Sequence, residues 1–513
     1  MSNQPASKVF FSRASIGAVP WILGSKVVLF FAYFGISILI VRGLGKEEYG
    51  VFALCKNIVD VAVILCGLGM NSAILRFVPE LVVKQNRAGL IRILWKSAAL
   101  QFVASAVSVA VLTPMTPLFD RWFGVSFGPL IFLSALSVGF LLAKSWYNDV
   151  LTSLFYGKWV AMLSLLQGLL WAGLLGWLVG RGGADVFSIL LVEILSIGVA
   201  GILAATILIR QVRSLKWKSP PQGIGQGRVW NLGLAVWGGS IGRAFMMKYT
   251  ETFFLGFYFG PSVVALYDLG YSSTMLVITF IPMALQTIFS SGLSEAYVKD
   301  PDCLPLLVGA LYKILILLSV PVAAFGVFYA PRAVVLFYGQ DMAGAGWVAA
   351  VFCGVHLLPM IAIPFSMAIG AKEKVKEFLP LLYLRVGVNL VLDWVLIPRF
   401  AIAGALAAVI LTFVLTFPFR LRLIRSVLGG FHFPRAFFLK FLIVCPLVAG
   451  AVHLLLPGAT IPGLLGAAAV YFSVFFLLLR FARLLQHRDV EELRQLQFAK
   501  LNLLLNLLVG KKA

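Results

Sequence analysis

The sequence predicts an all-α polytopic membrane protein that crosses the bilayer fourteen times. Of its 513 residues, 61% are hydrophobic and only 12% are charged, whereas soluble domains carry about 25% charged residues. The apolar residues form continuous blocks of about 20 residues, the length that a spanning helix needs, and do not alternate with polar residues as in a membrane β-barrel. Each such block must be helical, because only then are its backbone groups paired within lipid.

The fourteen blocks can be placed along the chain in order. Each is a run of apolar residues bounded by charged or turn-forming residues. The longest blocks are expected to tilt or to extend beyond the lipid. We expect spans at 16–41, 50–75, 91–114, 128–148, 160–180, 186–209, 231–257, 263–291, 305–329, 345–370, 377–397, 402–426, 436–456 and 462–482.

The distribution of Lys and Arg supports both the number of spans and their orientation. With the N-terminus inside, the inside segments hold 30 of the 42 basic residues and the outside loops hold six. One missed span would invert every later loop and remove this bias. The positive-inside rule therefore predicts that both termini are cytoplasmic, in the inner membrane of the cell. The same rule explains the net charge of +22. Binding to nucleic acid is not indicated, because no basic nucleic-acid-binding domain is visible.

The longest predicted inside loop divides the spans into two sets of six. It contains the helix-breaking run Ser219-Pro220-Pro221-Gln222-Gly223, and a basic loop between two six-helix halves is typical of two-lobed transporters. After the last span, leucines recur at helical spacing beside basic residues. This pattern predicts an amphipathic helix on the inner membrane face, and a soluble coiled segment is the alternative. The expected parts are an N-lobe at 1–215, a linker at 216–230, a C-lobe at 231–427, spans 13 and 14 within 433–483, and the amphipathic helix at 488–510.

The two halves share a weak sequence similarity. Residues 45–54 (GKEEYGVFAL) follow the first span, and residues 260–269 (GPSVVALYDL) follow the seventh. Both are short glycine-containing turns that lead into a helix with an aromatic residue, 215 positions apart. The pattern suggests a parallel repeat, although such a short match can also arise by coincidence.

Three stretches carry a resemblance to a known family. They are VRGLGKEEYGVFAL at 41–54 running on to GLGMNSAILRFVPE at 67–80, LGFYFGPSVVALY at 255–267, and NLVLDWVLIPRFAIAGALAA at 389–408. Together with the span pattern they resemble the polysaccharide-unit flippases of the Wzx type. These belong to the multidrug/oligosaccharidyl-lipid/polysaccharide exporter superfamily, which has the MATE-like fold.

The resemblance implies a function and a mechanism. A polyprenyl-pyrophosphate-linked glycan unit would be flipped from the inner to the outer leaflet by alternating access, for surface polysaccharide biosynthesis. Two six-helix lobes would surround a central cavity, with two extra C-terminal spans. The expected partners are the lipid-linked oligosaccharide, membrane lipids and a polysaccharide polymerase. No cofactor is expected, only coupling to a gradient of H⁺ or Na⁺ or to the membrane potential. Where many relatives carry an acidic residue in the seventh span, this chain has Lys248, Thr250 and Glu251.

Charged residues within spans are costly and so indicate a cavity, a pair or a functional site. Lys26 lies in the middle of the first span and Arg243 holds a similar place in the seventh, neither with an acidic residue within one turn. Arg grips phosphate through two donors and Lys acts as a point charge. These two residues are therefore candidates for binding a pyrophosphate, and a salt bridge between the lobes is the alternative.

Other charges are spaced for pairing within one helix. Lys56 and Asp60 are four residues apart, and Lys248 and Glu251 are three apart, so each pair shares a helix face. Mutual neutralisation is one interpretation, and a pair that opens for an anion is the other. Glu193 stands more isolated in the sequence and could carry a proton or sodium, or remain buried and protonated.

Arg385, Asn389 and Asp393 repeat every four residues and form a polar stripe on the eleventh span. Arg385 and Asp393 would lie about 12 Å apart along the helix, too far to pair directly. The stripe therefore predicts a wet face or partners on other helices. Altogether we expect a cationic cavity of Lys26, Arg243, Lys56, Lys248 and Arg385, with polar or ion-coupling roles for Asp60, Glu193, Glu251, Asn389 and Asp393.

Two other functions are alternatives to the flippase. A cation-coupled multidrug exporter of the same fold would favour an acidic cavity, whereas the isolated central charges here are basic. A membrane enzyme such as a glycan polymerase or glycosyltransferase is disfavoured, because no large outside loop, nucleophile–base pair or glycine-rich phosphate loop is visible. The five cysteines and four histidines show no metal-ligand spacing.

Overall fold

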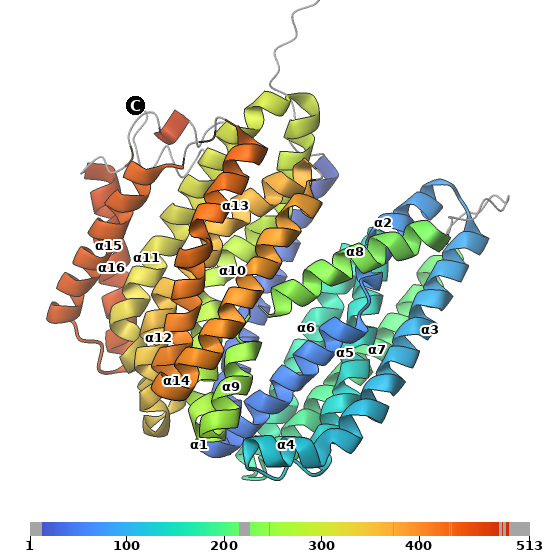
Figure 1. Cartoon of the computed structure of the whole chain (residues 1–513), viewed down its shortest axis with the longest axis horizontal. Helices are drawn as coiled ribbons and strands as arrows, with labels where there is room; N and C mark the ends of the chain where they lie inside the picture. Colours follow the sequence, from blue (N-terminus) through green and yellow to red (C-terminus); the bar gives the residue numbers. More distant parts are fainter. Residues whose placement is uncertain are drawn as a thin grey trace, which may run out of the picture. The chain divides into compact units, whose positions relative to one another are not determined.

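The computed structural model describes residues 13–214, 226–245, 247–372, 374–429, 431, 433–481, 485 and 489–491. Every regular element in these ranges is a helix, which confirms the predicted all-α class (Figure 1). The first part of the chain contains α1 (Arg13–Cys66), α2 (Met70–Val83), α3 (Arg87–Leu112), η1 (Thr113–Met115), α4 (Thr116–Phe123), α5 (Pro129–Ser153), α6 (Gly157–Gly180), α7 (Val186–Ser214), α8 (Gln226–Ala244) and α9 (Tyr249–Phe259). The later part contains α10 (Pro261–Lys299), η2 (Pro301–Cys303), α11 (Leu304–Tyr338), η3 (Gln340–Met342), α12 (Ala343–Val355), α13 (Leu357–Ala371), α14 (Val375–Leu428), α15 (Arg435–Leu455) and α16 (Ile461–Phe481).

Ten of the described helical segments are long and apolar enough to cross a membrane. Two of these, Lys26–Cys66 with 41 residues and Glu377–Leu428 with 52, are each long enough for two crossings. Each contains one residue with non-helical dihedral angles, Gly45 in the first and Ala401 in the second. These positions fall where two of the predicted spans meet.

Three of the predicted spans are interrupted. The span expected at 50–75 is divided between α1 and α2, the span at 231–257 between α8 and α9, and the span at 345–370 between α12 and α13. The last two contain no single helix long and apolar enough to be counted among the ten. The two double-length helices and these two broken spans account for the difference between ten candidate crossings and the fourteen that the sequence predicts.

Contacts between Cα atoms group the chain into two compact units. Ala18–Asp268 and Val386–Ala408 form one, here called the N-unit, while Leu269–Arg385 and the residues from Val409 onward form the other, the C-unit. The lobe boundaries predicted from the sequence stay a prediction. Most of the segment 488–510 lies outside the described residues, so the amphipathic helix does too.

The core of the N-unit is organised around α5, which packs against α2, α3, α6 and α7. Its buried residues include Ile131, Val138, Leu142, Val150 and Leu151. Ile131, Val138, Leu142 and Val150 recur at spacings of seven, four and eight, so they share one side of the helix. A neighbouring cluster joins α2 and α8, where Phe77 packs beside Val229. This contact holds the two helices that border the groove described below.

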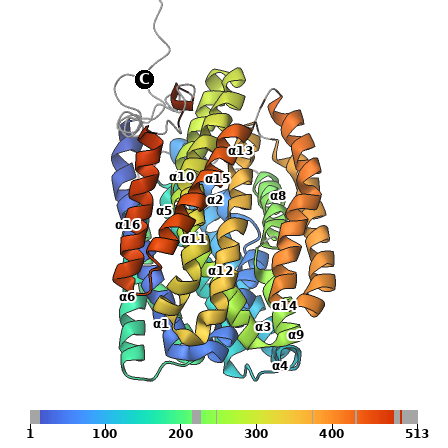
Figure 2. The same cartoon turned by 90° about the vertical axis from the view of Figure 1, so that its left-hand side faces the viewer.

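The core of the C-unit is organised around α11. This helix is apolar on all sides and largely buried, as expected for a helix without a polar face, and it packs against α12, α13, α15 and α16. The last two helices also pack against each other (Figure 2). Tyr329 and Tyr471 are almost completely buried at this contact. The hydroxyl of Tyr471 donates to the carbonyl of Pro321, 3.0 Å away, so the polar end of the buried ring is satisfied.

The two turns that share a sequence pattern also share a backbone conformation. Gly45 has φ 75° and ψ 179°, and Gly260, 215 positions later, has φ 78° and ψ −179°. Only glycine adopts this region readily. The matched dihedral angles support the interpretation of a parallel repeat, because the same turn follows the corresponding helix in each half of the sequence.

Candidate functional site

Lys56 is neutralised by a residue far away in the sequence. Its Nζ atom lies 2.8 Å and 3.0 Å from the two carboxylate oxygens of Glu193 on α7. The pairing of Lys56 with Asp60 on one helix face is therefore not its main contact, and Glu193 is not isolated as the sequence suggested. Sequence spacing reveals only neighbours on the same helix, whereas this partner is supplied by tertiary packing.

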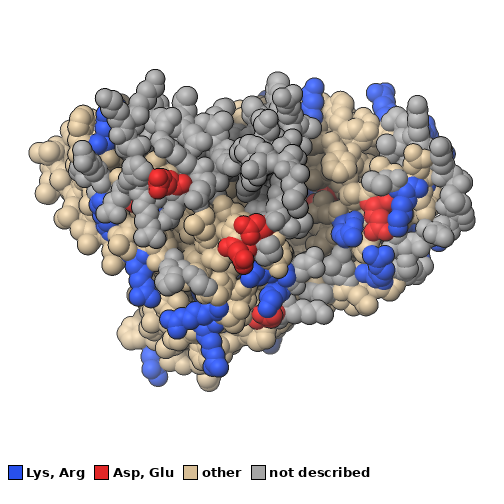
Figure 3. All heavy atoms as spheres, turned by 90° about the horizontal axis from the view of Figure 1, so that it is seen from above, with Lys and Arg blue, Asp and Glu red and all other residues tan. Residues whose placement is uncertain are grey.

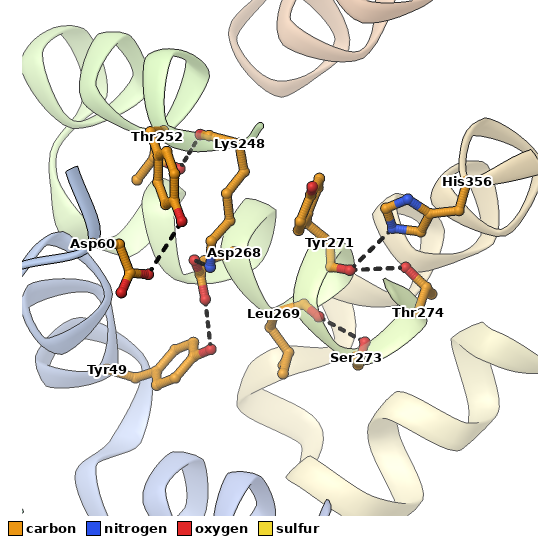
Figure 4. Close-up of polar contacts among 11 residues, drawn as sticks. Tyr49, Asp60, Lys248, Thr252, Asp268, Leu269, Tyr271, Ser273, Thr274 and His356 are labelled. Atoms are coloured by element: carbon orange, nitrogen blue, oxygen red, sulfur yellow. Dashed lines mark hydrogen bonds and ion pairs between the residues drawn. The ribbon is translucent and has the colours of Figure 1, made fainter. Parts of the chain in front are cut away.

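Lys248 is also paired outside its own helix (Figure 4). Its Nζ atom lies 2.5 Å from Oδ1 of Asp268, so the expected pairing with Glu251 is wrong. The Tyr49 hydroxyl donates to the other oxygen of Asp268 at 2.9 Å. The carboxylate of Asp60 accepts a longer hydrogen bond, 3.4 Å, from Tyr249. Two of the three lysines predicted for the cationic cavity in this unit, Lys56 and Lys248, thus have carboxylate partners.

A second polar group in the N-unit consists of two carboxyls and an amide. Asn389 Nδ2 lies 2.7 Å from Oδ2 of Asp393 and 3.4 Å from Oε1 of Glu251. The exposed fractions of Glu251 and Asp393 are 2% and 0%. The polar stripe of α14 therefore has its predicted partner on another helix, and that partner is Glu251 of α9.

This group has an unmet electrostatic requirement. Within the described residues, Glu251 Oε2 and Asp393 Oδ1 are buried without a hydrogen-bond partner, and neither carboxyl has an ion pair with Lys or Arg. The two carboxyls are close enough to repel each other when both are ionised. Such a pair needs a proton or a bound cation. Chemically, the arrangement can take up and release a small cation.

The two residues expected to bind pyrophosphate have different environments. Lys26 is partly buried in α1, and no partner is found for it in the part of the chain that the structure describes. Arg243 is exposed near the end of α8, where its Nη2 donates to Ser240 Oγ at 2.8 Å. Neither residue forms an ion pair among the described residues, and their role in binding pyrophosphate stays a prediction.

An open basic groove lies between α2 and α8. It has a volume of about 500 Å³ and is lined by Ser72, Arg76, Phe77, Arg228 and Asn231. The guanidinium carbons of Arg76 and Arg228 lie 5.9 Å and 5.5 Å from the centre of the Phe77 ring. Figure 3, which shows the molecule from above, has Lys and Arg atoms gathered around a small acidic group. Basic groups around an aromatic ring suit a sugar phosphate.

Glu80, which interacts with Arg76 of the groove, already has a basic partner. Glu80 accepts a hydrogen bond from Lys84 at 2.7 Å and a longer one, 3.5 Å, from Arg76. The interaction with Lys84 lowers the pKa of Glu80 below its usual value. Arg228 has no carboxylate within ion-pair distance among the described residues, so it remains available to an anion.

A buried arginine in the C-unit was not singled out by the sequence. Arg420 is 2% exposed, and it lies near the predicted site residue Arg385. Its neighbours Arg422 and Arg425, near the same end of α14, are exposed. The signal that could have found it is the spacing of four between Thr412, Thr416 and Arg420, which puts one polar stripe on a single helix face.

Comparison with known proteins identifies the class. The helical architecture is that of a polytopic membrane protein with the MATE-like fold. The chain matches the family described as "Polysaccharide biosynthesis protein" over residues 39–345, which is more than half its length, and it belongs to that family. A search of curated protein sequences found no match.

Solved structures share the fold. A lipid II flippase, MurJ, in an inward closed conformation is similar with a TM-score of 0.66 at 13% identity, covering 88% of this chain and 98% of that chain. An inward-facing MATE multidrug resistance transporter has a TM-score of 0.58 at 15% identity, covering 80% and 99%. A MOP superfamily transporter from Pyrococcus furiosus, described as having a binding pocket of reverse polarity, also has a TM-score of 0.58, at 16% identity, covering 80% and 96%.

Proposed function

We propose that the chain flips a polyprenyl-pyrophosphate-linked glycan unit from the inner to the outer leaflet of the cytoplasmic membrane. The observation that carries this proposal is the family match to polysaccharide biosynthesis proteins on a fold similar to that of a lipid II flippase. Alternating access moves the headgroup while the lipid tail stays in the bilayer. Both termini are cytoplasmic, and a polysaccharide polymerase on the outer side receives the unit.

The basic groove between α2 and α8 supports an anionic substrate. Arg76 and Arg228 flank segments that the charge bias places on the cytoplasmic side, which is where a lipid-linked glycan is assembled. The groove volume of about 500 Å³ falls within the usual range for sites that bind small ligands. Its arginines suit the pyrophosphate, and Phe77 offers an apolar face to a sugar ring.

The group of Glu251, Asn389 and Asp393 supports coupling to a cation. Binding of H⁺ or Na⁺ removes the repulsion between the two carboxyls, so the ion gradient is linked to a change in the electrostatics of the buried site. Such intramembrane carboxyls are typical of transport pathways. We therefore assign the coupling step to this group and the recognition of substrate to the basic residues.

The experiment is complementation of a cell from which the gene has been deleted. The wild-type chain should restore surface polysaccharide and prevent the accumulation of lipid-linked glycan on the inner leaflet. Glu251→Gln should reach the membrane at normal levels but fail to restore export. The matched control is Glu377→Gln, because Glu377 is an exposed carboxylate on α14, paired with Lys374 at 3.1 Å.

Two results would contradict the proposal. One is unchanged lipid-linked glycan in the deleted cell together with increased sensitivity to cationic drugs, which would favour the multidrug exporter. The other is full export by both Glu251→Gln and Asp393→Asn, which would remove the coupling assignment while leaving the flippase function intact.

A further inference from the structure

Arg420 carries a positive charge into the interior of the C-unit without a matching negative charge. The side chain is 2% exposed, and an arginine in a protein stays protonated. Its Nη1 has no hydrogen-bond partner, and Arg420 forms no ion pair within the described ranges. The guanidinium carbon lies 4.7 Å from the centre of the Phe413 ring. This contact stabilises the charge but does not satisfy the N–H donors.

A second positive charge lies within electrostatic range of the first. Arg385, from the other half of α14, is close enough for the two charges to repel each other. Its Nε is also buried without a hydrogen-bond partner in the described structure. Buried charges are normally paired, because removing an ion from water is costly. Two guanidinium groups that repel each other, each with an unused buried donor and no carboxylate partner among the described residues, indicate that an anion from outside the chain completes the site.

Polar residues of α14 lie on the same helix face as Arg420. Thr412 and Thr416 are buried on the same face of α14 as Arg420, and Thr412 Oγ1 has no hydrogen-bond partner in the described chain. Thr412, Thr416 and Arg420 form a polar track about 12 Å long, at 1.5 Å of rise per residue. Tyr312 on α11 is near enough to Arg420 to interact electrostatically. Hydroxyl groups and guanidinium groups are both suitable donors to oxyanions.

The depth of the pair identifies the kind of anion. In the predicted spans 377–397 and 402–426, Arg385 and Arg420 lie eight and six residues from the inner ends. At 1.5 Å per residue these positions are about 12 Å and about 9 Å inside the membrane. Bilayer phospholipids keep their headgroups at the membrane surface, outside the hydrocarbon core. A lipid whose headgroup is being moved across the bilayer meets the requirement.

We propose that Arg385 and Arg420 form an anion-binding site that holds the diphosphate of the lipid-linked substrate inside the C-unit. The identity of the lipid rests on the proposed flippase function, whereas the anion site rests on the unpaired guanidinium groups. Two planar donor groups match the several oxygens and the multiple negative charge of a diphosphate better than the single charge of a sugar carboxylate.

Binding of undecaprenyl diphosphate to the purified full-length chain in detergent micelles tests this site. Arg420→Gln should weaken binding by about tenfold or more, since hydrogen bonds to charged groups contribute that much. Arg420→Lys keeps the charge but loses the planar donors, so it should give an intermediate affinity. Arg422→Gln is the matched control, because Arg422 is an exposed arginine on the same helix, and its binding should be unchanged.

A thermal measurement separates a ligand site from a structural cation. Without ligand, Arg420→Gln should melt at the same temperature as the wild-type chain or higher, since it relieves the repulsion from Arg385. Undecaprenyl diphosphate should raise the melting temperature of the wild-type chain but not that of Arg420→Gln. A variant that melts lower without ligand yet binds normally would overturn the proposal.

The source of the anion is tested by competition. Phosphatidylglycerol in excess should not displace undecaprenyl diphosphate; displacement at equal concentration would overturn the diphosphate assignment. Failure of the flippase function has a different signature. In that case the deleted cell would export glycan normally, while the purified chain would still bind the diphosphate through Arg420.

Discussion

The Nζ atom of Lys56 lies 2.8 Å from Oε1 of Glu193, although the two residues are 137 positions apart in the chain. The contact joins α1 to α7 within the N-unit. The side chain of Glu193 is 7% exposed and that of Lys56 is 21% exposed, so water screens this pair less than it screens a surface pair. The contact therefore ties the two helices together and makes each charge dependent on the other.

Removal of either partner should destabilise the protein, and removal of both should not. Lys56→Met or Glu193→Gln leaves one charge without its partner, at a cost of about 3 kcal/mol. The double variant Lys56→Met/Glu193→Met should recover most of the lost stability. Melting temperatures of the purified variants provide the check, and a double variant no more stable than the single ones would show that the two residues do not act as a pair.

The contact of Tyr49 with Asp268 allows a graded test of the second pair. Tyr49→Phe removes one neutral donor to the carboxylate and should cost about 1 kcal/mol. Asp268→Asn removes the carboxylate that forms the ion pair with Lys248 and should cost clearly more, about 3 kcal/mol. The order of the two melting temperatures is the readout. Equal losses would mean that the ion pair contributes no more than the tyrosine hydrogen bond.

Two backbone positions should respond to substitution in opposite directions. Gly45→Ala places a side chain at φ 75° and should destabilise the turn by about 1–3 kcal/mol. Ala401 already has φ 48°, so Ala401→Gly should relieve strain and raise the melting temperature. Gly35→Ala is the control, since nothing lies within 4 Å of the added carbon. A stabilising Gly45→Ala would contradict the turn geometry.

Asn389 should be essential to the carboxyl group that it bridges. Asn389→Leu removes the donor to Asp393 and Glu251 while keeping a similar volume. The ionised carboxyls then lose a stabilising hydrogen bond, so they should bind H⁺ or Na⁺ about tenfold more tightly. The measurement is the dependence of transport on the concentration of H⁺ or Na⁺ in reconstituted vesicles. Leu390→Ala, a change at the next position, should leave that dependence unchanged. A normal ion dependence in Asn389→Leu would exclude the bridging role.

The sequence was sufficient to predict the fold class, because the relevant signals are local. These signals are the apolar runs of about 20 residues and the basic residues at their ends. Both can be recognised in the sequence without knowledge of how the helices pack. The paired turns at Gly45 and Gly260 were visible for the same reason. The interruptions between α8 and α9 and between α12 and α13 were not, since neither falls at a proline or another residue that must end a helix.

The site was less predictable, because its partners come from separate helices. Spacing correctly indicated that Asn389 and Asp393 share a face, but it paired Lys56 and Lys248 with neighbours on their own helices. Their carboxylate partners in the structure, Glu193 and Asp268, depend on packing. Arg420 was missed for a related reason, as a basic residue near the inner end of a span is usually exposed and burial appears only once the helices are assembled.

Reconstitution of the purified chain into liposomes measures the flippase function most directly. A labelled polyprenyl-pyrophosphate-linked glycan is placed in one leaflet, an ion gradient is applied, and the label that reaches the other leaflet is counted with a membrane-impermeant reagent. Our account predicts transfer that depends on the gradient, is lost in Glu251→Gln and persists in Glu377→Gln. Transfer no faster than in protein-free liposomes, together with gradient-driven export of a cationic dye, would contradict it.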